Sequence, residues 1–305
     1  MANKGKYYES QFEEATIELL REAHWQYKFG DDIHRKYTDP LIEEDLRNFL
    51  AVQYKDKNLT TSEIDGIVAN LRNIGGQNDY YALRNAFLLY RDGYDFAYSD
   101  GRDNPFRLEY IDFKYPNHNV FRCVNQFVME QGRENRRPDI LLFINGIPVC
   151  IIELKNPTKQ NATIRDAHTQ ICTRYMRDIP ALLKYCALAV ISDGAKNALG
   201  TTYTPFEFFY EWKKIENEDT AGKGLDTLRT LIRGALSPER ILEILRDYVY
   251  FPDPTKEDDT TEIVCRYPQF FATRKLRNHI LNHLRSVGGD GKGGTYFGAT
   301  GCGKT

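Results

Sequence analysis

The sequence lacks the long apolar runs that targeting and membrane segments need. The N-terminal stretch MANKGKYYESQFEEA contains no apolar core of the length found in signal peptides. No uncharged run elsewhere is long enough to cross a membrane. We therefore expect a cytoplasmic protein.

Cysteine is scarce and scattered. The six cysteines form no CxxC pair and have no histidine at ligand spacing, so the sequence does not indicate a zinc site. Several stand inside apolar runs, which favours reduced, buried thiols over disulfides. They are Cys123, Cys150, Cys172, Cys186, Cys265 and Cys302.

Charge of either sign is not in excess. The formal net charge is −2, so any surface for a polyanion must be local. Hydrophobic residues make up 41% and charged residues 28%, as is ordinary for a globular protein with a real core. A length of 305 residues predicts one large domain and part of a second.

The period of the apolar residues predicts an α/β fold, because helical spacing gives way to alternation near residue 106 and returns later. Ser10 and Ser237, the latter followed by Pro238, are expected N-caps, and Thr61 or Ser62 should open another helix. Helices are predicted over 9–23, 41–56, 61–74, 80–93 (helical or mixed), 163–178, 224–235, 238–248 and 270–286. Strands are predicted over 106–113, 119–130, 139–155 as a hairpin, 187–194 and, as an aromatic edge strand, 207–213.

The stretch FPDPTKEDDTTE, residues 251–262, is rich in proline and acid and contains no apolar period. This composition is typical of a linker. We therefore divide the chain into a first domain over 1–250, a linker over 251–262 and the beginning of a second domain over 263–305.

The hairpin DILLFINGIPVCIIELK carries the charges that suggest chemistry. Glu153 and Lys155 are two residues apart on a strand, so both side chains point to one face. The strand before them is apolar on both faces, and charges at the end of such a buried strand are costly without a purpose. Hydrolysis of a phosphodiester needs an activated water molecule and stabilisation of the negative charge that develops. Magnesium held by carboxylates, together with a nearby ammonium group, can meet both needs. A surface salt bridge is the alternative.

Asp139 opens the preceding strand, and the register decides whether it can join this pair. A plain two-residue turn at Asn145-Gly146 pairs residue 139 with residue 152, which puts Asp139 and Glu153 on opposite faces. Metal binding requires the same face. We therefore predict a three-residue connection with a left-handed Gly146, or a β-bulge, so that Asp139 opposes residue 151 or 153.

The segment RENRRPDILLFINGIPVCIIELKNP, residues 133–157, resembles the PD-(D/E)xK nuclease core in the motor (restriction) subunit of type I restriction-modification enzymes. The upstream VNQF and the downstream RDIPAL are similar to the same family, and the resemblance covers essentially the whole chain. It implies a mixed central sheet flanked by helices, Asp139 and Glu153 as Mg²⁺ ligands, and Lys155 as the group that positions water or stabilises charge.

Nucleases of this fold usually draw a further acid from the first helix. Glu13 fits best, because it lies one and two turns before apolar positions of that helix. Glu14 and Glu9 remain alternatives, and a solvated acidic face is an equal one.

The family also resembles nucleases with a Gln-x-x-x-Tyr motif on the next helix. Gln170 fits the first position, but Tyr175 follows five residues later instead of four. Five residues separate two side chains by about 140° round an α-helix. The two therefore share a face only if the helix carries a one-residue bulge.

The C-terminal GATGCGKT satisfies the GxxxxGK[ST] pattern of a phosphate-binding loop and follows a strand-like stretch. The residues expected to bind ATP are Gly298, Gly301, Gly303, Lys304 and Thr305. By resemblance the segment begins a RecA-like motor domain, cut after this motif, and Gln269 would contact adenine. A polar residue on an amphipathic helix is the alternative for Gln269. Without the rest of the motor, we expect no ATP hydrolysis.

Basic residues flank the acidic hairpin and could form a local rim for phosphates. Each of them alone is an ordinary solvated charge, so the expectation rests on the cluster. Its members are Arg133, Arg136, Arg137, Lys155 and Lys159.

The sequence thus predicts magnesium-dependent, endonucleolytic cleavage of double-stranded DNA, coupled in a longer subunit to ATP-driven translocation. The resemblance implies the methyltransferase and specificity subunits as partners, and we expect little cleavage by this chain alone. One alternative is a non-cleaving DNA clamp or docking domain of a helicase-like motor, and another is a repair nuclease of the same fold.

Overall fold

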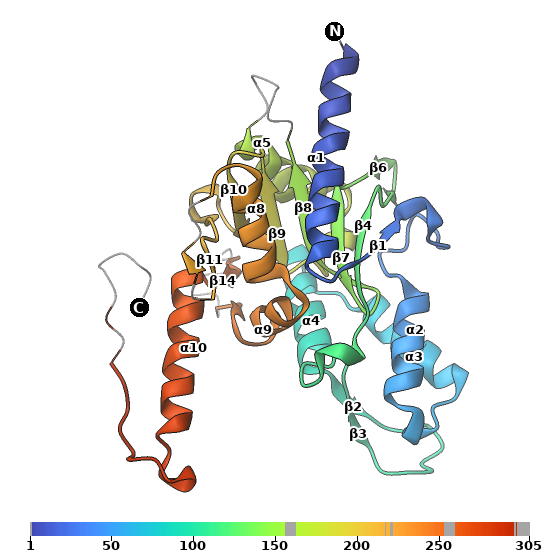
Figure 1. Ribbon diagram of the computed structural model, residues 1–305. Coiled ribbons are helices and arrows are strands. Elements are labelled where there is room, and N and C mark those ends of the chain that lie inside the picture. The colour runs from blue at the N-terminus through green and yellow to red at the C-terminus, as the bar shows by residue number, and fades with distance from the viewer. Residues whose placement is uncertain are drawn as a thin grey trace.

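A mixed sheet forms the centre of the molecule in the computed structural model (Figure 1). The structure describes residues 2–155, 163–216, 218–219, 222–252, 260–295 and 297. The strand order is β1-β4-β7-β8-β9-β10. These strands are β1 (Gln26–Phe29), β4 (Phe121–Asn125), β7 (Ile140–Ile144), β8 (Ile147–Leu154), β9 (Leu188–Ser192) and β10 (Asn197–Gly200).

Strand direction changes across this sheet. The pairs β1–β4 and β8–β9 are parallel, whereas β4–β7, β7–β8 and β9–β10 are antiparallel. The central strands β7 and β8 are buried along their whole length. Both therefore read as continuous apolar runs, and the prediction of a mixed sheet flanked by helices is confirmed.

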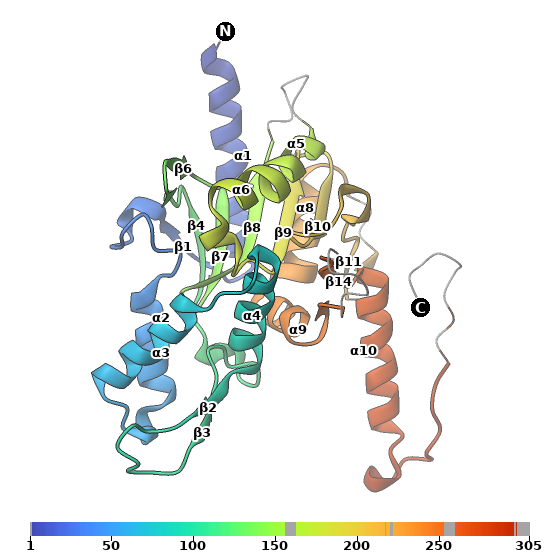
Figure 2. The same cartoon turned by 180° about the vertical axis from the view of Figure 1, so that it is seen from behind.

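Alternate residues of the strands feed two core clusters, one on each face of the sheet. The first core cluster joins Ile140, Cys150 and Ile152 to helices that include α1 (Ala2–Glu22), α2 (Glu43–Gln53), α3 (Thr61–Asn73), α4 (Asp79–Asp92), α8 (Leu225–Leu231), α9 (Pro238–Asp247) and α10 (Tyr267–Asn282). The second core cluster joins Leu141 and Ile151 to α5 (Ile164–Thr169), the π-helical turn η4 (Gln170–Tyr175), α6 (Met176–Asp178) and α7 (Pro180–Leu183). Figure 2 shows α5 and α6 lying across the second face.

Short two-stranded pairings decorate this body. The β5–β6 hairpin lies near the end of the sheet where α1 and α5 also lie (Figure 1). The pairs are β2 (Tyr94–Phe96) with β3 (Phe106–Leu108), β5 (Met129–Gln131) with β6 (Glu134–Arg136), β11 (Lys214–Ile215) with β12 (Glu218–Asp219), and β13 (Val249–Tyr250) with β14 (Ile263–Val264).

Several predicted elements differ from the observed ones. Helix α1 begins at Ala2, because no proline interrupts the residues before Ser10. The N-cap of α3 is Thr60, which forms a capping box with Glu63. The predicted strand over 106–113 ends at Leu108.

The aromatic segment 207–213 is not an edge strand. It forms the short turn η5 (Phe206–Phe208) and a single bridge between Leu199 and Tyr210. Phe206 and Phe209 both pack edge-on against the His168 ring, so these side chains do not alternate as strand residues do.

The segments on both sides of the predicted linker contact the same body. Strand β13 pairs with β14, and Phe270 and Phe271 of α10 join the first core cluster. Residues 253–259 of the linker lie outside the described residues. Along the described parts of the chain, no helix combines the length and the apolar character that crossing a bilayer requires.

Candidate active site

The predicted acidic pair lies at the end of the sheet where β7 begins and β8 ends. Ile140 pairs with Ile152, so continuing the antiparallel register by one residue sets Asp139 opposite Glu153. The Asp139 carboxylate accepts a hydrogen bond from the backbone N–H of Leu154 at 2.7 Å. Because opposite residues of an antiparallel pair point the same way, the two carboxyl groups share a face of the sheet.

A β-bulge produces this register. Leu142 pairs with Cys150 whereas Phe143 pairs with Pro148, which leaves Val149 as an extra residue on β8. Val149 and Cys150 both point into the first core cluster, so alternation is suspended for one step and then resumes. The expectation of a bulge is confirmed.

The connection itself has two residues, so the alternative of a three-residue connection is wrong. Asn145 and Gly146 join Ile144 to Ile147 with φ angles of 50° and 79°. Two left-handed residues are what a tight hairpin turn of type I′ needs. A Cβ on Gly146 would lie 2.1 Å from the carbonyl oxygen of Ile42, so only glycine fits there.

Glu153 and Lys155 contact each other at this edge. The Lys155 ammonium donates to Glu153 Oε1 at 2.7 Å, with Glu153 only 1% exposed and Lys155 14% exposed in their side chains. Two residues apart on one strand, both side chains reach the same face, as predicted.

The environment of Glu153 disfavours its charged form. Burial and, less strongly, the neighbouring Asp139 carboxylate raise the pKa of Glu153 to about 8, although Lys155 and Tyr175 oppose the shift. A metal ion that binds Glu153 would therefore have to displace this proton.

A π-helical turn resolves the spacing of Gln170 and Tyr175. Residues Gln170–Tyr175 form η4, which inserts one residue between α5 and α6. The two side chains consequently meet, and Gln170 Nε2 donates to the Tyr175 hydroxyl at 2.7 Å. The sequence left Tyr175 open, and its five-residue spacing was the signal that such a bulge was required.

Gln170 and Tyr175 complete a ring of four side chains around the acidic edge. Lys155 Nζ donates to Gln170 Oε1 at 2.7 Å, in addition to its bond with Glu153. The Tyr175 hydroxyl donates to Glu153 Oε2 at 3.2 Å, and Tyr175 is buried. Every member of the ring therefore orients two others, which holds Lys155 and Glu153 in fixed positions.

Glu13 is not joined to this ring. Its carboxylate accepts hydrogen bonds from Asn125 Nδ2 at 2.6 Å and from Gln126 Nε2 at 3.0 Å, at the end of β4. Helix α1 packs on the face of the first core cluster, whereas Tyr175 belongs to the second, and Glu153 points to the same face of β8 as Ile151 of that second cluster. Glu14 is exposed on the same helix. The metal-binding role of an acid from α1 stays a prediction.

The oxygen atoms of Asp139 and Glu153 suit magnesium. This ion is commonly held by one or two carboxylates, with water and substrate oxygens in its other positions. Within the described ranges, no group of three or more His, Cys, Asp and Glu residues gathers closely enough to hold a metal. Asp139 and Glu153 are therefore candidate ligands only as a pair.

The basic residues near the hairpin differ in their surroundings. Arg136 binds the buried Asp178 carboxylate at 2.7 Å and also contacts Glu134. Arg133 and Arg137 are exposed. Lys159 lies outside the described residues.

Gln269 lies in the first turn of α10, where its side-chain oxygen accepts the backbone N–H of Arg266 at 2.8 Å. It lines a pocket of about 450 Å³ with Tyr210, Phe208 and Glu262. The phosphate-loop residues Gly298, Gly301, Gly303, Lys304 and Thr305 lie outside the described residues.

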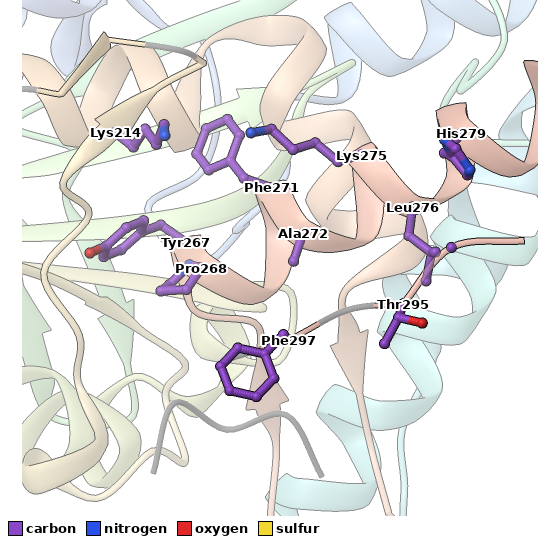
Figure 3. Close-up of a pocket in the computed structure, with 11 residues that line it drawn as sticks. Lys214, Tyr267, Pro268, Phe271, Ala272, Lys275, Leu276, His279, Thr295 and Phe297 are labelled. Carbon is purple, nitrogen blue, oxygen red and sulfur yellow. The ribbon is translucent and has the colours of Figure 1, made fainter. Parts of the chain in front are cut away.

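A second pocket, of about 760 Å³, lies against α10 and is shown in Figure 3. Phe271, Leu276 and Phe297 are among its apolar lining residues, and Lys214 and Lys275 stand at its edge. No residue of the acidic ring lines it. The two described pockets at α10 are therefore separate from the acidic edge.

Comparison with known proteins assigns the chain to a family. Residues 6–208 match the family described as type I restriction enzyme R protein N terminus. The chain is 28% identical to the HindI endonuclease subunit of Haemophilus influenzae, over 97% of this chain and 29% of that protein. It is also 28% identical to the putative MjaIXP endonuclease subunit of Methanocaldococcus jannaschii, over 89% of this chain and 28% of that protein.

A third relative is the EcoprrI endonuclease subunit of Escherichia coli, 28% identical over 73% of this chain and 64% of that protein. All three are named as type I restriction enzyme subunits. The chain spans less than a third of the length of the first two. Since the family model covers residues 6–208, the chain belongs to the family of type I restriction enzyme R proteins, whose N-terminal region it matches.

Proposed function

We propose that this protein carries a magnesium-dependent nuclease of the PD-(D/E)xK type. It would cleave double-stranded DNA at internal phosphodiester bonds, as an endonuclease does. The observation that carries the proposal is the β7–β8 bulge, because it sets Asp139 opposite Glu153 with Lys155 in contact. A bulge that re-aims side chains at a strand end is typical of active sites. Its relatives are named endonuclease subunits.

Each residue of the ring has a role in this proposal. Bound magnesium would activate a water molecule and neutralise the charge of the cleaved phosphate. Asp139 and Glu153 would bind the ion, which requires Glu153 to lose its proton. Lys155 would stabilise the negative charge that develops on the phosphate oxygens. Gln170 and Tyr175 hold Lys155 and Glu153 in place.

The wider activity extends beyond the described residues. We propose that ATP binds through the GATGCGKT loop, with adenine near Gln269, and that hydrolysis in a longer subunit drives DNA past the nuclease. The methyltransferase and specificity subunits would supply sequence recognition. This part rests on the loop motif and on the pocket that Gln269 lines.

A non-cleaving DNA clamp is the competing function. The contacts of Glu13 favour it, because this acid already accepts hydrogen bonds from the amide groups of Asn125 and Gln126. A clamp would need no divalent metal at Asp139. Metal binding therefore separates the two functions.

Calorimetry with Mn²⁺ tests the proposal. We expect the chain to bind manganese, and Asp139→Ala to abolish the binding because a single carboxyl remains. Asp56→Ala is the matched control, since Asp56 is an exposed acid in a different element. The absence of manganese binding to the unaltered chain at about pH 8, where Glu153 can ionise, would refute the nuclease proposal.

Lys155→Ala separates metal binding from chemistry. We expect the unaltered chain to nick supercoiled plasmid slowly at high concentration, and this variant to bind manganese without nicking. Nicking that is equal in Lys155→Ala and in the unaltered chain would exclude a catalytic role for the ammonium group.

A further inference from the structure

The arginines of the predicted basic rim beside the acidic edge are of two kinds: Arg136 forms ion pairs within the protein, whereas the other arginines of that set form none with the described residues. Arg136 binds Asp178, which is only 4% exposed, and Arg177 binds the other oxygen of Asp178 at 2.6 Å. The Gln131 side chain accepts the backbone N–H of Ala181 at 3.0 Å. These bonds attach the β5–β6 hairpin to α6 and α7. The guanidinium of Arg136 is therefore engaged in an internal ion pair and is not available to bind a ligand.

Arg133 and Arg137 are different. Arg133 occupies the exposed two-residue turn of the hairpin, beside the left-handed Gly132. Arg137 is exposed two residues before Asp139. Neither guanidinium forms an ion pair or a hydrogen bond with any of the residues that the structure describes. An exposed arginine commonly finds an acid on this protein, as Arg102 finds Glu63.

A third free arginine lies on the π-helical turn. Arg174 is exposed on η4, between Gln170 and Tyr175 of the ring, and within the described ranges it too lacks an ion pair. Hydrogen bonds from Thr163 lower the pKa of Asp166, and the charges of Lys155 and Arg174 contribute to the same lowering. Arg174 and Lys155 therefore act on one neighbourhood at the edge of the site.

We propose that Arg133, Arg137 and Arg174 form a phosphate rim that holds the backbone of duplex DNA over the acidic edge, while Arg136 only fastens the hairpin. The proposal rests on the proposed nuclease function, since it names how the same site grips its substrate. Guanidinium groups match phosphate oxygens as two-pronged donors. Because the chain has a net charge of −2, the attraction must come from such local groups.

The rim also answers an electrostatic problem of the site. Asp139 repels a phosphate group until a metal neutralises it, and Lys155 is occupied by Glu153 and Gln170. Cations that make no internal contact are the groups able to offset this repulsion. The hairpin supplies two of them, and the helix that contributes Gln170 and Tyr175 supplies the third.

Salt titrations of DNA binding test the rim. A short fluorescein-labelled duplex is bound by the chain in EDTA, so that no metal-dependent cleavage intervenes, and fluorescence anisotropy gives the affinity. We expect Arg133→Gln, Arg137→Gln and Arg174→Gln each to weaken binding about threefold to tenfold. Each should also lower the slope of log affinity against log salt by about 0.9, the value for one lost phosphate contact.

Arg277→Gln is the matched control, because Arg277 is exposed on α10 and forms no ion pair with described residues. We expect its slope to equal that of the unaltered chain. An unchanged slope in the triple variant of the rim, with an unchanged circular-dichroism melting curve, would overturn the proposal. Equal slope losses in Arg277→Gln would overturn it as well.

The result is independent of the nuclease test. If the rim variants lose slope while manganese fails to bind, the rim stands and the nuclease function fails. If manganese binds and the slopes do not change, the nuclease function stands and the rim is wrong.

Discussion

At the scale of single residues, the main energetic question is how the buried carboxyl group of Glu153 is held in place. Its pKa of about 8 means that ionising it in the folded protein costs about 5 kcal/mol more than in water. A buried carboxyl group without compensation would be replaced easily by an apolar residue of the same size. Lys155 and Tyr175 each bind one of its oxygens, so its position is maintained by two other side chains.

Tyr175→Phe tests how much the hydroxyl contributes to this arrangement. The change keeps the ring in the second core cluster but removes the donor to Glu153 and leaves Gln170 Nε2 without its acceptor. We expect the free energy of unfolding to fall by about 1–3 kcal/mol. We also expect manganese affinity to fall severalfold in calorimetry, because Glu153 loses its orientation.

Tyr185→Phe serves as the comparison, since Tyr185 is equally buried and its hydroxyl donates to the Leu71 carbonyl far from the site. A similar loss of stability is expected there with unchanged manganese affinity. If both variants change manganese affinity equally, the effect is a general loosening of the fold and Tyr175 has no special role.

At the scale of elements, two one-residue irregularities bring the site together. The β7–β8 bulge aligns Asp139 with Glu153, and the π-turn η4 aligns Tyr175 with Gln170. The sequence predicted that both alignments needed an extra residue, because regular periods of 2 and 3.6 placed the side chains on different faces. The proposed chemistry requires each pair of side chains to share a face, whereas regular strand and helix periods at this sequence spacing would separate them.

The place of the strand bulge was not predictable from the spacing. The bulge falls at Val149 and Cys150, because both side chains find space in the first core cluster. That space is made by helices far away in the sequence. The contacts of Glu13 were hidden for the same reason, since they depend on how α1 meets the end of β4.

Deleting Thr173 tests whether η4 carries an insertion. Thr173 is exposed within the turn, and its removal leaves Gln170 and Tyr175 four residues apart, as a regular α-helix requires. We expect the ring to survive, manganese affinity to stay within about twofold, and the free energy of unfolding to rise by about 1 kcal/mol as regular hydrogen bonds form.

Deleting Asn48 is the comparison. Asn48 is exposed on α2, which has no such insertion, so its loss rotates the buried Phe49 and Leu50 by about 100° round the helix. We expect that variant to unfold at much lower temperature. Equal destabilisation by both deletions, measured by circular dichroism, would show that η4 is an integral turn without a spare residue.

At the scale of the whole molecule, buried ionisable groups couple stability to pH. Glu262, just before β14, is 2% exposed, and neither carboxyl oxygen has a hydrogen-bond partner among the described residues. The nearby Thr201 hydroxyl donates instead to the Glu262 backbone carbonyl at 3.3 Å. The titratable groups around it are Tyr90, Cys172, Cys186 and Tyr203, whose pKa values burial also raises.

Burial raises the pKa of Glu262 well above its usual value, so the folded protein keeps this proton at a pH where the unfolded chain has released it. The stability from the protonated carboxyl is complete below about pH 4.3, the value for an unfolded glutamate, and is lost as the pH rises towards the folded pKa.

Glu262→Gln removes the titration. We therefore expect urea unfolding of the variant and the unaltered chain to diverge between about pH 5 and about pH 8, by at least about 1 kcal/mol in favour of the variant at the higher pH. Glu207→Gln, at an exposed position on η5, should show a constant difference across the same range. A constant difference for Glu262→Gln too would mean that the carboxyl ionises in the folded protein as easily as in water, and that the end of the chain holding β14 opens to solvent before the sheet unfolds.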